Sequence, residues 1–271
     1  MKNLLIALFF LPIIIVAQST GTGFAINSNG YIATNFHVIK GSDKVTIRGI
    51  HGNHQKSYKA TVVKVDKMND LAILKVNEEL GKIPYGFKKS KEDVASAIYA
   101  YGYPLPELQG YEIKITEGII NSNSGLKDEP RWYQHTASIQ SGNSGGPLFN
   151  RYGNLVGINN AGIDNDYVKE IYGTETTNVN YAIKSRYLLA LMEDLELRPL
   201  VNSGINKLEL SQQYKKIKNF VYFITASSDK NNLINSNVYT QNTFKWYTDI
   251  NEASQFSKKI NKPLMLYFTG S

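Results

Sequence analysis

The chain has 271 residues, which is enough for one large domain or two modest ones. It carries 30 Lys and Arg against 23 Asp and Glu, a formal charge of +7. That charge is spread along the sequence, so the concentrated basic patch of a nucleic-acid groove is not expected. Hydrophobic residues make up 42%, which excludes a wholly disordered chain. There is no cysteine, so disulfides, thiolate catalysis and cysteine-bound zinc are excluded, and we expect neither a cofactor nor a metal.

The N-terminus has the pattern of a signal peptide over residues 1–17. Lys2 precedes an apolar run over residues 4–17, which is shorter than the ~20 residues of a spanning helix and is interrupted by Pro12. The residues around Ala17 suit a signal-peptidase site and predict cleavage after it. The alternative is an uncleaved anchor, the one case in which we expect contact with a membrane. Either way we expect the rest of the chain to be exported, to the bacterial periplasm or outside the cell.

Short β-like runs separated by turn residues extend from residue 21 to about residue 187. They are GFAI, YIAT, KVTIRGI, ATVVKV, LAILKV, IYAYGY, YEIKITEGII, PLFN, NLVGINN and VNYAI. Runs of this length and spacing predict a sandwich or a barrel rather than a βαβ sheet. Apolar residues at helical spacing first occur over residues 185–197, where we expect a short helix.

The composition changes after Pro199. We expect residues 193–242 to form a polar linker with one strand, in KNFVYFITAS. Residues 243–271 combine a helical pattern with the apolar run PLMLYF, and predict a partial α/β tail that opens a second domain.

Ser144 lies in GNSGGP, with glycines on both sides. A serine hydroxyl is a weak nucleophile that needs an adjacent base and an anion hole. Glycines let the chain turn sharply enough for backbone N–H groups to form that hole. An ordinary Gly/Ser turn between two strands explains GNSG equally well.

The order of residues along the chain discriminates between the folds that use such a serine. G-x-S-x-G is also the nucleophile elbow of α/β-hydrolases, in which the histidine follows the serine. Here all histidines precede Ser144: His37, His51, His54 and His135. The first aspartate, Asp43, comes after His37, which excludes the subtilisin order for that histidine. The remaining familiar order is His, Asp, Ser.

Taken singly, the other candidate residues are weak signals. His37 follows a strand-like run, where a histidine is more often structural than catalytic, and Asp70 opens NDLAILKV, where a turn cap is common. His51 and His54 form H-x-x-H without acidic or cysteine partners nearby, so we interpret them as surface residues rather than metal ligands. His135 is interpreted as an ordinary polar strand residue.

Four blocks together resemble the protease domain of the HtrA-type, trypsin-like serine proteases: GTGFAINSNGYIATNFHVI, NDLAILKV, SIQSGNSGGPLFNRYGNLVGI and NVNYAI. We assign residues 18–192 to this domain. The resemblance implies a mostly β, chymotrypsin-like fold of two antiparallel barrels, with a catalytic triad of His37, Asp70 and Ser144 in the cleft between them. The implied enzyme is a serine endopeptidase.

The resemblance also implies a role for each residue. His37 is the general base, Asp70 holds its tautomer and stabilises its charged form, and Ser144 attacks the peptide carbonyl to form an acyl-enzyme. The N–H groups of Gly142 and Ser144 form the oxyanion hole. Activity should fall in acid, when the imidazole is protonated.

Further residues are implied to bind the substrate, which we expect to be an unfolded polypeptide. By alignment, Ser138 lies near the base of the pocket for the residue before the scissile bond. Because Ser138 is not acidic, we expect small or medium aliphatic residues in that pocket. Asn160, Ala161 and Gly162 would pair with the substrate backbone as an added strand.

The chain departs from the family pattern on both sides of this domain. Only Gln18, Ser19 and Thr20 lie between the predicted cleavage and Gly21, so we expect the family's further strand and its trimer contact to be missing; another route to an oligomer stays open. The residues after Pro199 show no pattern of a carboxylate-binding loop, so we do not expect them to form a PDZ-like domain. Residues 243–271 instead resemble the opening of a thioredoxin-like domain, whose redox Cys-x-x-Cys would come just beyond residue 271, so we predict no redox activity from these residues.

Three functions follow, in order of preference. The first is an exported serine endopeptidase. The second is a catalytically inactive or gated barrel that binds peptides, which shares every sequence feature except a working triad. The third is a fragment of a protease–thioredoxin fusion whose main role lies in the thioredoxin-like part.

Overall fold

The computed structural model describes residues 18–161, 179–200 and 203–228. These residues belong to one unit, Met1–Lys230, and Asn231–Ser271 form a second. The predicted leader at 1–17, the thioredoxin-like region at 243–271 and the candidate residue Gly162 lie outside the described residues.

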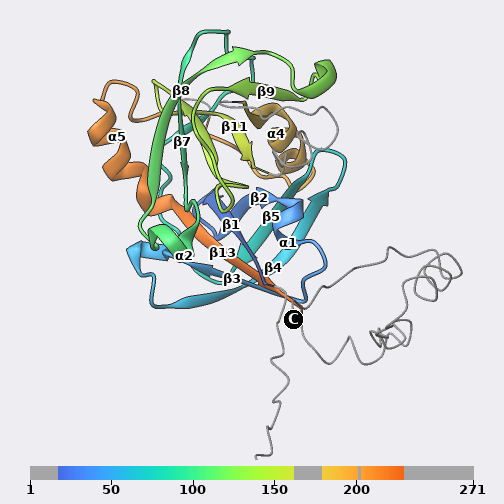
Figure 1. The fold of residues 1–271 in the computed structure, drawn as a ribbon. Coiled ribbons are helices and arrows are strands. Elements are labelled where there is room, and N and C mark those ends of the chain that lie inside the picture. Colours follow the sequence, from blue (N-terminus) through green and yellow to red (C-terminus); the bar gives the residue numbers. More distant parts are fainter. Residues whose placement is uncertain (1–17, 162–178, 201–202, 229–271) are drawn as a thin grey trace, which may run out of the picture. The chain divides into compact units, whose positions relative to one another are not determined.

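The first five long strands of the chain and β13 from its end form a closed antiparallel barrel, shown in the lower part of Figure 1. Its strands follow one another around the barrel in the order β1, β13, β3, β4, β5 and β2. Their bounds are β1 Gln18–Ala25, β2 Tyr31–Asn35, β3 Lys44–Arg48, β4 Ser57–Asp66, β5 Leu71–Val76 and β13 Val221–Ser227. These strands correspond to the first five predicted runs and to KNFVYFITAS.

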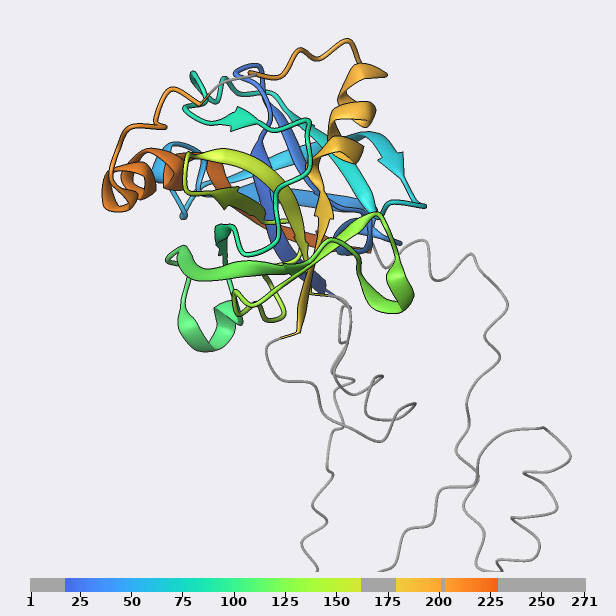
Figure 2. The same cartoon turned by 90° about the horizontal axis from the view of Figure 1, so that it is seen from above.

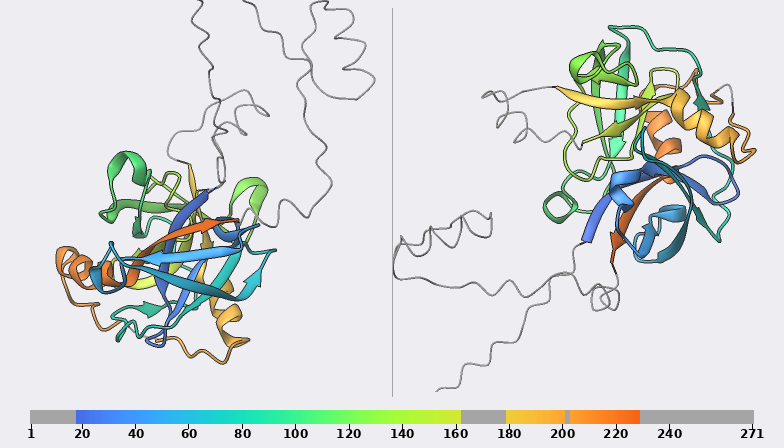
Figure 3. Two further views of the ribbon diagram at one scale, coloured as in Figure 1. Left: turned by 90° about the horizontal axis from the view of Figure 1, so that it is seen from below. Right: turned by 90° about the vertical axis from the view of Figure 1, so that its right-hand side faces the viewer.

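Strand β13 closes this barrel from a distant part of the sequence. It pairs with β1 from Gln18↔Ser227 to Phe24↔Val221, and with β3 on its other edge. Figure 3 shows β13, in orange, beside the blue strands β1 and β3. The strand expected in KNFVYFITAS is therefore present, but its place in a polar linker was wrong, because both of its edges are paired and its apolar side chains are buried. It also supplies the barrel strand that the sequence before Gly21 was expected to lack.

The second barrel is formed by consecutive parts of the chain. Its strands run in the order β10, β7, β8, β9, β12 and β11, and pairing of β10 with β11 closes it. Their bounds are β7 Ala97–Gly102, β8 Lys114–Ser122, β9 Trp132–His135, β10 Pro147–Asn150, β11 Asn154–Asn160 and β12 Asn180–Lys184. The short β6, Gly86–Phe87, adds a parallel pairing on β11 that the sequence pattern missed. The fold class, a mostly β double barrel, is confirmed.

Helices are short and lie outside the barrels. They are α1 Phe36–Ile39, α2 Pro106–Gln109, α4 Ser185–Glu193 and α5 Leu210–Ile217, with 3₁₀ turns at Ile50–Gly52, Leu126–Asp128 and Lys218–Phe220. Helix α4 confirms the helix predicted from residue 185, and α4 and α5 lie on different sides of the second barrel (Figures 1 and 2). Within the described residues, every helix is too short or too polar to cross a membrane.

Two hydrophobic cores hold the barrels. The larger one fills the first barrel and continues to the inner face of α4, and it includes Phe24, Ile47, Leu74, Ile224 and Leu188. The smaller one lies in the second barrel and includes Ile98, Ile120, Tyr133, Leu148 and Val156. Burying each of the large aliphatic side chains contributes about 1.5–3 kcal/mol, so the two cores fix the barrels and, with them, the loops that carry the candidate site.

Candidate active site

His37 and Asp70 meet at one end of the first barrel. Strand β2 ends at Asn35, and the short helix α1 that follows carries His37. The backbone N–H of His37 donates to Asp70 Oδ1 at 2.8 Å, and His37 Nδ1 lies 2.6 Å from Asp70 Oδ2. This two-point contact fixes the ring. Because a carboxylate only accepts, Nδ1 carries the ring proton and Nε2 is left as the acceptor.

The Asp70 residue is itself held from both barrels. Its backbone carbonyl accepts hydrogen bonds from the Phe36 N–H at 3.1 Å and from Asn35 Nδ2 at 3.0 Å. Its Oδ2 atom accepts a further bond, at 3.2 Å, from Nδ2 of Asn160 at the end of β11 in the second barrel. Asn35 is fully buried, and its position directly before F-H-V is the only sequence signal that would have identified it.

Ser144 lies in a tight loop before β10, with its side chain nearly buried. Gly142 and Gly145 have φ of +97° and +82°, in the region that glycine adopts without strain. A Cβ on Gly145 would lie 2.2 Å from Thr34 Oγ1, and one on Gly142 would lie 2.2 Å from the Tyr103 carbonyl oxygen. The glycines predicted to permit a sharp turn are therefore required by both backbone conformation and packing.

Thr22, on β1, holds both ends of the Gly142–Ser144 tripeptide. Its N–H donates to the Ser144 carbonyl at 2.8 Å, and its Oγ1 donates to the Gly142 carbonyl at 2.6 Å. Thr22 is fully buried, and its Oγ1 also accepts from the Tyr103 N–H at 3.1 Å. The sequence pattern GTGF contains this threonine but does not indicate its role.

The peptide between Ser141 and Gly142 has a defined direction. The Ser141 carbonyl accepts from the Leu105 N–H at 2.8 Å. In a trans peptide the C=O and N–H groups point to opposite sides, so the Gly142 N–H points away from Leu105. Within the described part of the chain, neither the Gly142 N–H nor the Ser144 N–H donates a hydrogen bond.

Two consecutive residues at the end of β11 connect the acid and the serine. Asn160 contacts Asp70, and the N–H of Ala161 donates to Ser144 Oγ at 3.3 Å. Among the described residues no hydrogen bond joins the His37 ring directly to Ser144 Oγ. Asn160, predicted to pair with the substrate backbone, therefore has its side chain on Asp70.

Among the described residues, Ser138 and the other three histidines form no hydrogen bond with His37, Asp70 or Ser144. Ser138 is exposed, and its carbonyl accepts from Thr116 Oγ1 at 2.8 Å. His51 is exposed, as predicted, but His54 is half-buried, with its ring 5.8 Å from that of Tyr103. His135 lies on β9 and is fully buried, and this desolvation lowers its pKa to about 4. It is therefore neutral at pH 7.

Two barrels with a His–Asp pair in the first and a glycine-flanked serine in the second define the architecture of a trypsin-like serine peptidase. The profile of the trypsin-like peptidase domain matches residues 21–158, about half of the sequence, and the chain belongs to this family.

Similar proteins agree with this assignment. The chain is 38% identical over 147 residues to a probable periplasmic serine endoprotease, DegP-like, of Hahella chejuensis, covering 53% of this chain and 30% of that protein. It is 32% identical over 210 residues to the uncharacterized protein y4bJ of Sinorhizobium fredii, covering 78% and 32% of the two chains. The chain thus spans about a third of the length of these curated relatives.

Solved structures also match. The serine endoprotease from Yersinia pestis is 28% identical, with a TM-score of 0.51 over 65% of this chain and 57% of that one. The HtrA-type protease AlgW with decapeptide is 26% identical, with a TM-score of 0.52 over 65% and 51%. The domain is an HtrA-type, trypsin-like serine protease domain, as the sequence blocks predicted.

Proposed function

We propose that this chain is a serine endopeptidase that cleaves peptide bonds through His37, Asp70 and Ser144. The observation that carries the proposal is a pair of contacts made by consecutive residues: Asn160, the last residue of β11, contacts the Asp70 carboxylate, and Ala161, which follows it, contacts Ser144 Oγ. A two-residue segment that touches both groups supports a single site built from both barrels.

His37 acts as the general base in this mechanism. With Nδ1–H on Asp70, Nε2 accepts the proton of Ser144 Oγ as that oxygen attacks the peptide carbonyl, and later returns it to the leaving amine. The absence of a direct hydrogen bond between His37 and Ser144 is compatible with this role, because such bonds are often long without substrate and tighten when it binds.

The N–H groups of Gly142 and Ser144 stabilise the oxyanion. The Leu105 N–H on the Ser141 carbonyl turns the Gly142 N–H to the opposite side, and Thr22 holds the two ends of the tripeptide. An anion hole whose donors are already oriented requires little reorganisation when charge develops on the carbonyl oxygen.

Polypeptides, expected to be unfolded, are the proposed substrates, with small or medium aliphatic residues before the scissile bond because Ser138 brings no charge to the pocket. Export to the periplasm is proposed from the leader pattern, and the periplasmic names of the DegP-like relatives support it.

One contact favours a second candidate, a gated barrel that binds peptides without cleaving them. Ser144 Oγ accepts a hydrogen bond from Ala161, and among the described residues no hydrogen bond joins it to His37. A gated site would need a ligand to bring these two side chains together.

Hydrolysis of denatured casein separates the two candidates. We expect the wild type to cleave casein, Ser144→Ala to fall to background, and Ser141→Ala to stay near the wild type, because Ser141 is an exposed neighbour of the same residue type. Equal cleavage by the wild type and Ser144→Ala would remove the proposed function. A wild type that binds casein without cutting it would favour the gated barrel.

A further inference from the structure

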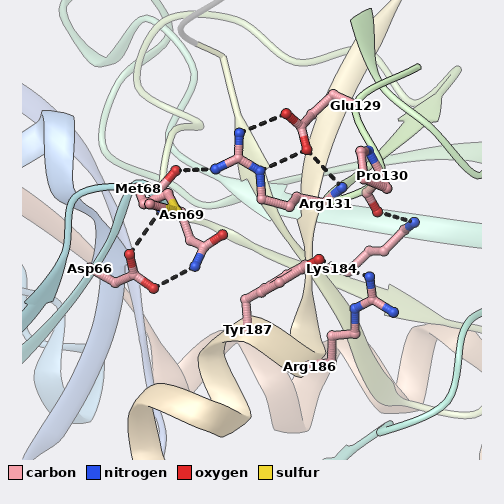
Figure 4. A network of polar contacts seen from close by, with 9 residues as sticks. All are labelled: Asp66, Met68, Asn69, Glu129, Pro130, Arg131, Lys184, Arg186 and Tyr187. Carbon is pink, nitrogen blue, oxygen red and sulfur yellow. Dashed lines mark hydrogen bonds and ion pairs between the residues drawn. The ribbon is translucent and has the colours of Figure 1, made fainter. Parts of the chain in front are cut away.

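Arg131, in the loop before β9, reaches from the second barrel to the turn that precedes Asp70. Its Nη1 donates to the backbone carbonyl of Met68 at 2.5 Å, two residues before Asp70 (Figure 4). The contact joins a side chain of the second barrel to the backbone that leads directly to the proposed acid, so an inference about it rests on the proposed function.

The Arg131 guanidinium is held in place by Glu129. Nε donates to Oε1 at 2.7 Å and Nη2 donates to Oε2 at 2.6 Å, while the Arg131 backbone N–H also reaches Oε1 at 3.1 Å. Side-chain exposure is only 27% for Arg131 and 26% for Glu129. A bidentate fork of this kind fixes the plane of the guanidinium, so Nη1 has a defined direction toward Met68.

The backbone beneath this pair is anchored by Lys184 at the end of β12. Lys184 is 2% exposed, and its ammonium donates to the carbonyls of Asn123 and Pro130 at 2.6 Å each. Those carbonyls lie at the two ends of the loop that carries Glu129 and precedes Arg131, as Figure 4 shows for Pro130. Arg131 therefore projects from a loop that is tied to the barrel wall.

The turn that Arg131 contacts carries strain. Asp70 has a φ of +52°, a left-handed conformation that a residue with a side chain adopts only when its surroundings hold it there. Asp66 supports the start of the turn, because its carboxylate accepts from both the N–H and the side-chain amide of Asn69. The second barrel holds this turn at the Met68 carbonyl, in addition to the bond from Asn160 to the Asp70 carboxylate.

We propose that Arg131, fixed by Glu129, is a positioning residue for the Asp70–His37 pair. By holding the Met68 carbonyl it keeps the turn in the conformation that places both Asp70 oxygens on His37, one on the backbone N–H and one on Nδ1. Both the orientation of the base and the stabilisation of its charged form depend on that placement.

The test is the kinetics of Arg131→Met in the full-length chain. Methionine keeps much of the apolar stem but removes the fork. We expect kcat to fall between about tenfold and a hundredfold with KM within about twofold, because small displacements of a catalytic group have effects of that size. The shape of the pH–rate profile should change as well, because a displaced Asp70 no longer holds the His37 ring in one orientation. The kcat of Arg131→Lys should lie between that of the wild type and that of Arg131→Met.

The matched control is Lys64→Met, which removes another cation that bonds an acidic residue of a different element. Lys64 on β4 lies 3.2 Å from Asp194 beyond α4, both more exposed than the Arg131 pair. We expect this variant to keep the wild-type kcat and pH profile. If Arg131→Met lowers the melting temperature but leaves both unchanged, Arg131 is only a structural tie and the inference is wrong.

A second variant covers the case in which Arg131→Met does not fold. Glu129→Gln keeps the size of the side chain but weakens the fork, and it should give a smaller loss of kcat with a smaller change of the same kind in the pH–rate profile. An unchanged profile in this folded variant would also overturn the inference. A wild type no more active than Ser144→Ala would instead remove the proposed function, and this inference with it.

Discussion

The two barrels of this chain are closed in different ways. The second is completed within residues 97–184, by the pairing of β10 with β11. The first needs β13, which is separated from β5 by the whole second barrel and inserts between β1 and β3. His37 and Asp70 therefore lie on the barrel whose closure depends on the last part of the described chain.

Closure by β13 also reaches the loop beside the serine. The Phe223 ring lies 5.7 Å from that of Tyr103 and 5.2 Å from that of Tyr111, and the Tyr103 hydroxyl donates to the Val221 carbonyl at 3.1 Å. Tyr103 and Tyr111 flank the segment whose Leu105 N–H holds Ser141. The C-terminal strand thus supports both halves of the proposed site.

The largest expected effect comes from opening the core at β13. Ile224→Ala on β13 and Ile98→Ala on β7 each remove a fully buried isoleucine and should each cost about 2–5 kcal/mol of unfolding free energy. Only Ile224→Ala should speed amide hydrogen exchange in β1 and β3. Equal protection of β1 and β3 in the two variants would contradict the account of closure by β13.

The next effect is on catalysis. Gly142→Ala should lower kcat by about 10²–10³, because its φ of +97° and the Tyr103 carbonyl both oppose a Cβ and displace an oxyanion donor. Gly110→Ala is the control, since Gly110 has a φ of +76° but a Cβ there would meet nothing within 4 Å. If Gly110→Ala lost as much activity, backbone strain alone would explain the result.

His135 should make the second barrel sensitive to acid. Its pKa is lowered from 6.5 to about 4 by burial, so below pH 6.5 the unfolded chain binds a proton that the native chain does not. Stability should fall by about 3 kcal/mol between pH 6.5 and 4. Urea unfolding of His135→Phe should lack most of this loss, and an unchanged slope would contradict the assignment.

A separate acid step should follow at lower pH. The hydrogen bonds from Arg131 lower the pKa of Glu129 from 4.5 to about 2, so its contribution is present above pH 4.5 and is lost as the pH falls toward 2. Urea unfolding measured above and below pH 4 therefore separates the contribution of His135 from that of Glu129.

The smallest effect is at the contact between the barrels. Thr22→Val keeps the shape of the side chain but leaves the Gly142 carbonyl and the Tyr103 N–H without their partner, at a cost of about 1–3 kcal/mol. We expect kcat to fall as well, by less than in Gly142→Ala. Thr22→Ser should restore both stability and rate, and failure of this rescue would assign the effect to packing of the methyl group.

Local pattern predicted most of the fold. Runs of β-branched and aromatic residues identified the longer strands, including β13, because strand formation depends on neighbours in the sequence. The partners of β13 could not be predicted, since pairing with β1 and β3 is a long-range contact that its own sequence does not encode.

The same limit applies to the candidate site. His37, Asp70 and Ser144 could be proposed from their order and blocks, and the structure brings His37 onto Asp70. Thr22, Asn35 and Arg131 could not, because each acts through a backbone carbonyl, and any residue type presents such a group.

The most direct test of the central claim is the reaction of the full chain with a fluorophosphonate, with the modified residue located by mass spectrometry. The account predicts one adduct, on Ser144, that disappears in Ser144→Ala and persists in Ser141→Ala. In Asp70→Asn it should form more slowly by up to about 10⁴-fold, the loss seen when the acid of a Ser-His-Asp triad is changed in this way. An adduct elsewhere, or labelling of Ser144 at the same rate in Asp70→Asn, would contradict it.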